Sequence, residues 1–192
     1  MLIDRIKQYI SENDNGVVVF KEEKEFAEKY QLAENLSEQD PNLRFADAYI
    51  ERCDKQSENM IRRETSEFLT QPLEYLKKQK DEFIYVESKW FDIVLVDSVS
   101  LEVDDVFNNY DVMLGLKLQK KFANKIRDFL NNHLLGDETK FDLLFSGEDG
   151  LWNLNFPLNY VDGFDENMSI GGGFQLIYHF LFKLIEAVEG EA

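Results

Sequence analysis

The chain has 192 residues, of which 38 are Asp or Glu and 21 are Lys or Arg, so its formal net charge is −17. Its 16 Phe, 8 Tyr and 2 Trp supply the apolar burial that a disordered chain lacks, and 10 Gly with 3 Pro are too few for a collagenous or low-complexity chain. No stretch approaches the roughly 20 apolar residues that span a bilayer, so we expect one globular domain.

Cysteine usage and charge set the expected compartment and partners. Cys53 is the single cysteine and cannot form an internal disulfide, and residues 1–7 contain no signal-peptide core, so we expect a cytoplasmic protein. An acidic surface repels nucleic acid and anionic membranes, and neither is an expected partner. Residues 117–127 differ because they carry five cations and no acid. We interpret them as a solvated face, with binding of phosphate or of an acidic partner as the alternative.

Residues 1–81 are predicted to form a helical segment that packs on the rest of the same domain. Apolar spacing indicates a helix over residues 2–10, followed by a turn at 13–16. A longer apolar pattern predicts a helix over residues 46–68, and a second helix is expected from Pro72 to Lys80.

Residues 82–192 are predicted to form an antiparallel sheet with two helices. The apolar period changes from 3.6 to 2 at Glu82, and strands are expected at 83–87, 91–103, 110–116, 141–145 and 151–161. Helical spacing returns over residues 118–133 and again from Phe174 to Val188. The predicted fold class is α+β, with N-terminal helices followed by an antiparallel sheet of about five strands (βββ-α-ββ-α) covered by helices.

The element order over residues 43–188 resembles the secretion-chaperone-like fold, a family of small acidic cytosolic dimers that hold partner polypeptides. A second resemblance, over residues 82–118 and 151–189, is to short uncharacterised bacterial cytosolic proteins, some of which carry a branched-chain aminotransferase label. The segments that carry it are Trp90-Phe91-Asp92, Leu101-Glu102-Val103-Asp104-Asp105-Val106 and Trp152-Asn153-Leu154-Asn155. An aminotransferase needs a Schiff-base lysine and a phosphate cradle, and no lysine here has that context, so we expect no cofactor.

The sequence contains no complete catalytic or metal-binding pattern. Glu87-Ser88-Lys89 matches the acid-x-Lys element of metal-dependent nucleases but lacks an Asp on a preceding strand. The acidic groups lack calcium-loop spacing, and the histidines have no metal-type partner, so we expect neither an enzyme nor a metal site. The alternatives are a cation at one acidic group, a catalytic histidine, or an anion at the helix entry; the residues concerned are Glu102, Asp104, Asp105, Glu148, Asp149, Asp162, Asp165, Glu166, His133, His179 and Gly171-Gly172-Gly173.

The predicted strand 151–161 carries amide side chains on one face. Its apolar residues alternate with Asn153, Asn155, Pro157 and Asn159. Pro157 cannot donate a ladder hydrogen bond, so we predict an edge strand or a bulge. The three asparagines are then candidates for contacts with a ligand or with a partner backbone added at that edge. A hydrated outer sheet face is the alternative.

The last predicted helix is apolar almost all round. A domain of this size offers few surfaces that bury such a helix, so we expect a second copy of the chain to cover part of it. The candidate interface residues are Phe174, Ile177, Tyr178, Leu181, Phe182 and Ile185.

Together these features favour a cytoplasmic, non-catalytic interaction protein, adaptor or chaperone-like, that forms a homodimer and holds an unknown protein partner. One alternative is a small-molecule enzyme or ligand-binding domain that uses the asparagine face with Glu102 and Asp104. Such a domain requires a pocket that joins these side chains and a carboxylate with a raised pKa. The other alternative is an acidic inhibitor that masks a basic partner.

Overall fold

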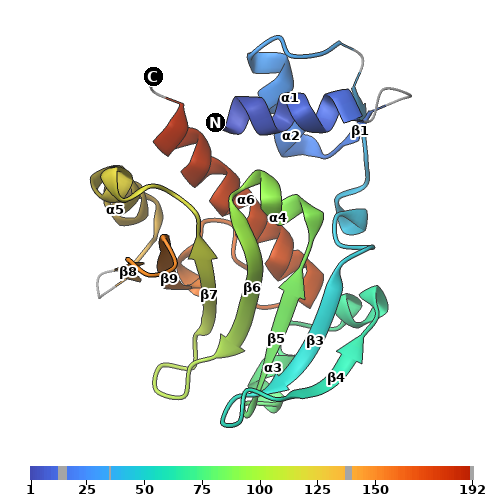
Figure 1. Cartoon of the computed structure of the whole chain (residues 1–192). Helices are drawn as coiled ribbons and strands as arrows, with labels where there is room; N and C mark the ends of the chain where they lie inside the picture. The colour runs from blue at the N-terminus through green and yellow to red at the C-terminus, as the bar shows by residue number, and fades with distance from the viewer. Residues whose placement is uncertain (13–16, 35, 137–139, 191–192) are drawn as a thin grey trace.

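A seven-stranded antiparallel sheet forms the centre of the fold in the computed structural model, which describes residues 1–12, 17–34, 36–136 and 140–190 (Figure 1). The strand order is β4-β3-β5-β6-β7-β9-β8. These strands are β3 (Tyr49–Asp54), β4 (Met60–Glu64), β5 (Glu82–Glu87), β6 (Val96–Val103), β7 (Tyr110–Leu116), β8 (Asp142–Ser146) and β9 (Leu151–Pro157). A separate parallel pair joins β1 (Val18–Val19) to β2 (Ser37–Glu38).

The helices lie at one face and at the ends of the sheet. The α-helices are α1 (Leu2–Glu12), α2 (Lys21–Lys29), α3 (Tyr75–Lys78), α4 (Lys89–Ile93), α5 (Ala123–His133) and α6 (Ile170–Glu189). Short 3₁₀ turns are η1 (Pro41–Leu43), η2 (Ser66–Thr70), η3 (Lys120–Phe122) and η4 (Leu158–Tyr160). Figure 1 shows α6 passing behind the sheet, whereas no described helix lies in front of β3, β5, β6 and β7.

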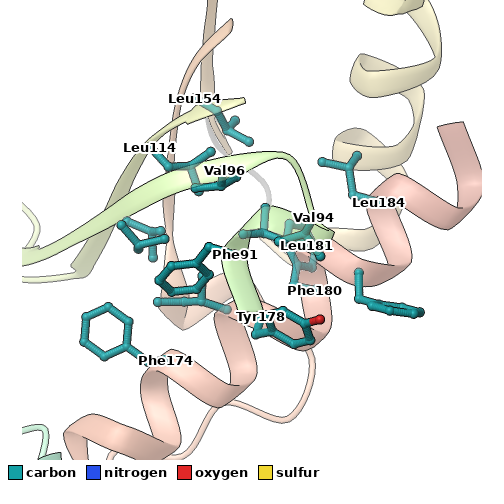
Figure 2. Close-up of a cluster of buried hydrophobic side chains, with 14 of the residues drawn as sticks. Phe91, Val94, Val96, Leu114, Leu154, Phe174, Tyr178, Phe180, Leu181 and Leu184 are labelled. Carbon is teal, nitrogen blue, oxygen red and sulfur yellow. The ribbon is translucent and has the colours of Figure 1, made fainter. Parts of the chain in front are cut away.

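The long helix α6 provides the centre of the core. The Ser169 hydroxyl caps it by accepting a hydrogen bond from the Gly172 amide at 3.0 Å. A side chain at Gly171 would bring its Cβ to 3.2 Å from the Leu69 carbonyl oxygen, so glycine allows η2 to approach the first turn closely. Figure 2 shows side chains of α6 gathered against those of α4 and the sheet, among them Phe174, Phe91 and Leu114.

Strand periodicity decides which side chains join this core. On β6 and β7, Leu101 and Val112 are paired and fully buried against the helices. Their neighbours Glu102 and Asp111 are paired on the opposite face and are partly exposed. Because successive side chains of a strand point to opposite faces of the sheet, one face is apolar and covered by helices, and the other is polar and has no described helix on it.

The N-terminal helices are attached to α6 through a buried charge network, here called the Arg44 network. Glu23 and Arg44 are 0% and 3% exposed. The Arg44 guanidinium donates to both carboxylate oxygens of Glu23, at 2.8 and 3.1 Å, and to Glu22 at 2.6 Å. The Tyr178 hydroxyl of α6 also donates to Glu23, and the guanidinium lies 3.9 Å from the centre of the Tyr178 ring. Every buried charge in this network is paired, as burial in a low-dielectric interior requires.

The predicted α+β class with an antiparallel sheet and helices is confirmed, but the sheet has seven strands rather than five. The predicted helix over residues 46–68 is wrong, because this segment forms the hairpin β3–β4. Ile50 and Cys53 share a face of a helix, whereas in β3 they point to opposite faces and are both buried. Because residues on both faces of β3 are buried, its apolar residues have a three-residue spacing that resembles the period of a helix.

The other predicted elements agree with the structure in most of their length. The strand predicted at 91–103 is shorter, because Ser88 caps the short helix α4 before β6 begins. The helix predicted from Pro72 reduces to α3, and the strand predicted at 151–161 ends at Pro157. The turn predicted at residues 13–16 lies outside the described residues.

Among the helices of the described residues, none combines the length and apolar character needed to cross a membrane.

Candidate functional site

The six candidate interface side chains of α6 are buried within their own chain. Phe174, Ile177, Tyr178, Leu181 and Ile185 are fully buried and Phe182 nearly so. The expectation that this helix exposes more apolar surface than one chain can cover is therefore wrong. Burial is complete because the helix packs on the sheet on one side and on α2, α4 and α5 around it, as the ring contacts of Phe182 with Phe26 and of Phe180 with Phe129 illustrate.

The asparagine strand β9 is not an edge strand. It pairs with β7 on one side and with β8 on the other, so its backbone has no free edge for a partner strand. Pro157 is tolerated because it is the last residue of β9, beyond the end of its pairing with β8. Asn153 and Asn155 are exposed on the face without helices, whereas the Asn159 side chain accepts a hydrogen bond from the Tyr110 amide at 2.7 Å.

The face of the sheet without helices is called the open sheet face. Its side chains, taken from the strand register, include acids, aromatic rings, small polar groups and the basic residue Arg63: Tyr49, Glu51, Cys53, Arg63, Phe83, Tyr85, Glu87, Ser98, Ser100, Glu102, Asp111, Met113, Asn153 and Asn155. Tyr85 donates to Glu87 at 2.6 Å, so part of the acidity is satisfied internally. The remaining carboxylates are concentrated towards the β6–β7 hairpin.

An open cavity of about 620 Å³, here called the acidic cavity, lies where the β6–β7 hairpin meets β9. Carboxylates and aromatic rings line it together: Asp104, Phe107, Asn109, Asp111, Phe141, Asp142, Asn155, Phe156, Pro157 and Tyr160. The cavity thus joins one predicted acid, Asp104, to one predicted asparagine, Asn155. Apolar walls around a few carboxylates are the usual composition of a binding pocket.

Asp111 is the most perturbed carboxylate at this site. It lies directly across from Glu102 on the neighbouring strand, and like charges placed in this way repel each other. Desolvation, with the charges of Asp104 and Glu102, raises the pKa of Asp111 from 3.8 to about 6. Within the described residues, no hydrogen-bond donor is found for its carboxylate. Negative charge at this position is therefore poorly compensated.

Among the acids at the β6–β7 hairpin, Lys55 forms ion pairs with Glu102 and Asp105. Its ammonium nitrogen lies 3.5 Å from a Glu102 oxygen and 3.8 Å from Asp105, and it donates to the Val103 carbonyl oxygen. Burial nevertheless raises the pKa of Glu102, partly opposed by Lys55. The chain itself thus shows a lysine bound beside the acidic cavity, while Asp104 and Asp111 face the cavity.

The candidate cysteine, histidines and glycines have structural surroundings that account for them. Burial beside Glu51 raises the pKa of the Cys53 thiol to about 11, which opposes a reactive thiolate. The Nδ1 atom of His133 lies 2.9 Å from the Phe129 carbonyl oxygen, and that of His179 lies 2.9 Å from Glu22. Gly171, Gly172 and Gly173 form the first turn of α6, where the Ser169 cap already occupies the Gly172 amide.

The basic segment 117–127 also makes contacts within the chain. Lys117 pairs with Asp97 across the β6–β7 sheet end, and Arg127 donates to the Leu143 carbonyl oxygen at 3.1 Å. Lys120 and Lys121 lie over the rings of Phe145 and Phe122. Among the described residues, no group of three or more His, Cys, Asp or Glu side chains is arranged to hold a metal ion.

Sequence reasoning missed Asp111, Phe107 and the Arg44 network. Asp111 occupied the polar position of a predicted strand, and its place opposite Glu102 follows from a register that periodicity does not fix. Glu23 and Arg44 lie 21 residues apart in segments that read as ordinary charged surface. The local signal for Phe107 was the segment Asp105-Val106-Phe107, which places two apolar residues directly before the predicted turn at Asn108-Asn109.

The fold and this site together define an α+β protein with one helix-covered and one open sheet face. No family model, no curated protein and no solved structure matches the chain. The resemblance to the secretion-chaperone-like fold rested on an element order that begins with a helix over residues 46–68, and the structure has the hairpin β3–β4 in place of that helix. The function is therefore inferred from the geometry of the open sheet face and the acidic cavity.

The perturbed Asp111 leads to a prediction for stability against pH. Its folded pKa of about 6 lies above the unfolded value of 3.8, so the folded state binds more protons between these values and loses stability as the pH rises through them. We expect Asp111→Asn to become more stable than the wild type by about 1 kcal/mol at pH 7.5, after allowance for solvent screening, and by far less at pH 4. Urea unfolding at both pH values measures the difference. The exposed Asp162→Asn serves as control, and an equal gain in that variant would contradict the prediction.

Proposed function

We propose that the chain is a non-catalytic interaction protein that holds a basic polypeptide segment on its open sheet face, with the acidic cavity as the main contact. The observation that carries the proposal is Asp111, a carboxylate that lines an accessible cavity and lies directly across from Glu102, whose own ion pair is with Lys55. A bound cation would offset the desolvation and the neighbouring negative charges that raise the pKa of Asp111.

The net charge of −17 supports this proposal, because it steers basic partners towards the protein and repels nucleic acid. An inhibitor that masks a basic partner would use the same surface. We place the activity in the cytoplasm, because the single cysteine Cys53 forms no disulfide framework. Self-association stays a prediction, but the burial of α6 gives it no support.

The proposal predicts salt-sensitive binding of basic peptides. A short peptide that alternates lysine and serine is expected to bind at about 50 mM salt and to weaken strongly at about 300 mM, because screening acts on exposed charge pairs. The double variant Glu102→Gln/Asp111→Asn should bind about 5- to 10-fold more weakly. Fluorescence anisotropy of the labelled peptide measures both effects.

The matched control is Glu25→Gln/Glu28→Gln, which removes two exposed charges from α2 and changes the net charge equally. If both double variants weaken binding to the same extent, the peptide responds to net charge alone and the site assignment fails. Equal binding of a glutamate–serine peptide would contradict the proposal outright.

A small-molecule site is the second candidate, and the pKa of about 6 at Asp111 inside a cavity favours it. A carboxyl group with this pKa accepts or donates a proton near neutral pH. The same cavity would then take a small amine rather than a peptide. Calorimetric titration with a short alkyl diamine distinguishes the two, because a diamine that binds more tightly than the lysine–serine peptide would favour the small-molecule function.

A further inference from the structure

Two large apolar side chains project from the tip of the β6–β7 hairpin beside the acidic cavity. Val106 is 78% exposed and Phe107 is 68% exposed, and the Phe107 ring also lines the cavity. Exposed aromatic side chains next to a pocket are typical of contact sites, since they bury much area at low entropic cost.

The backbone holds these two side chains outwards. The Asp104 side chain accepts hydrogen bonds from the amides of both Val106 and Phe107. The hairpin closes through the Asp104 amide to the Asn109 carbonyl oxygen at 2.8 Å, and through the Asn108 amide to the Asp104 carbonyl oxygen at 3.0 Å. Asn108 adopts a left-handed conformation that asparagine tolerates. The tip is therefore an ordered turn that presents Val106 and Phe107 away from the core.

The same residue, Asp104, connects the apolar tip to the cavity. Asp104 lines the cavity and its carboxylate also organises the tip, so the acidic cavity and an apolar surface are adjacent. The cavity walls beyond it, Phe141, Pro157 and Tyr160, suit the aliphatic stem of a lysine or arginine whose charged head reaches Asp111.

We propose that the bound partner is a polypeptide segment in which a lysine or arginine is adjacent to a large apolar residue. The basic side chain enters the acidic cavity, and the apolar side chain packs on Val106 and Phe107. This inference rests on the proposed function and adds the recognition pattern of the partner.

Charge complementarity supports this occupant over a lipid surface. The tip is flanked by Asp104 and Asp105, and the facing strand positions carry Glu102 and Asp111. Anionic headgroups would be repelled by these acids, whereas a basic segment gains contacts with both the acids and the apolar tip.

The test compares three peptides of equal length, which alternate lysine with serine, lysine with leucine, and glutamate with leucine. We expect the lysine–leucine peptide to bind about 10-fold more tightly than the lysine–serine peptide. In Val106→Ser, which changes the tip but not the cavity lining, this advantage should fall by about 3-fold or more, while binding of the lysine–serine peptide stays within about 2-fold of wild type. Asp111→Asn should weaken both lysine peptides.

The control variant Val18→Ser/Leu43→Ser removes two exposed apolar side chains from the N-terminal segment and should leave all affinities unchanged. Thermal unfolding verifies that each variant is folded. The inference is overturned if leucine gives no advantage, if the glutamate–leucine peptide binds as tightly, or if the tip variant weakens both lysine peptides equally. In the first and last of these cases, binding of lysine peptides still supports the proposed function, whereas a lack of binding by either lysine peptide removes both.

Discussion

Replacing Arg44 with methionine is expected to destabilise the fold by about 3 to 5 kcal/mol, the typical cost of leaving a buried charge without its partner. Glu23 is fully buried and receives two hydrogen bonds from the Arg44 guanidinium. Methionine keeps much of the apolar contact with the Tyr178 ring but supplies no positive charge. Urea unfolding at neutral pH measures the loss.

The double variant Arg44→Met/Glu23→Gln distinguishes the cost of leaving the Glu23 charge unpaired from the cost of losing the packing contacts of Arg44. Because it removes both charges of the most deeply buried pair, we expect it to be more stable than Arg44→Met alone. Arg62→Met, at a side chain 69% exposed, should change stability by less than about 0.5 kcal/mol. A double variant less stable than the single one would contradict this account of the Arg44 network.

The second large effect is expected in the core of α6. Phe174→Ala should cost about 3 to 5 kcal/mol, because a fully buried ring leaves a cavity that a packed core fills poorly. Phe174 contacts the Phe45 ring, with ring centres 6.1 Å apart, and lies in the cluster that Figure 2 shows.

This loss also tests where α6 is buried. Since the helix packs within its own chain, the unfolding midpoint of wild type and variant should not depend on protein concentration. A midpoint that rises with concentration would indicate a second copy of the chain on the fold. Leu144→Ala, at a side chain 70% exposed on β8, is the control and should have little effect.

The sequence predicted the α+β class because strand and helix periods differ clearly in residues 82–188. β7 alternates without exception, and α6 has both the Ser169 cap and a long apolar run. The prediction failed where burial did not follow one face, as at Ile50 and Cys53 in β3. It also failed for Pro157, whose position at a strand end has the same sequence signature as an edge strand.

The candidate site was predictable in part. Asp104 and Asn155 were proposed from local alternation and do line the same cavity. Asp111 and Phe107 were missed, because their importance depends on which strands pair and on how far a hairpin tip projects. Such properties arise from tertiary arrangement and leave little trace in the composition of one segment.

The place of α6 after every strand of the sheet has a consequence for biosynthesis. The strands leave the ribosome first, and the apolar side of β6 and β7 has only the short helices that precede α6, such as α4, as cover until the helix that begins at Ile170 emerges. A nascent chain at that stage exposes a large hydrophobic surface, which favours aggregation or binding by chaperones. Ribosome-bound chains that stop before Ile170 should therefore be sensitive to proteases, and protection should arise abruptly once Val188 has cleared the exit tunnel.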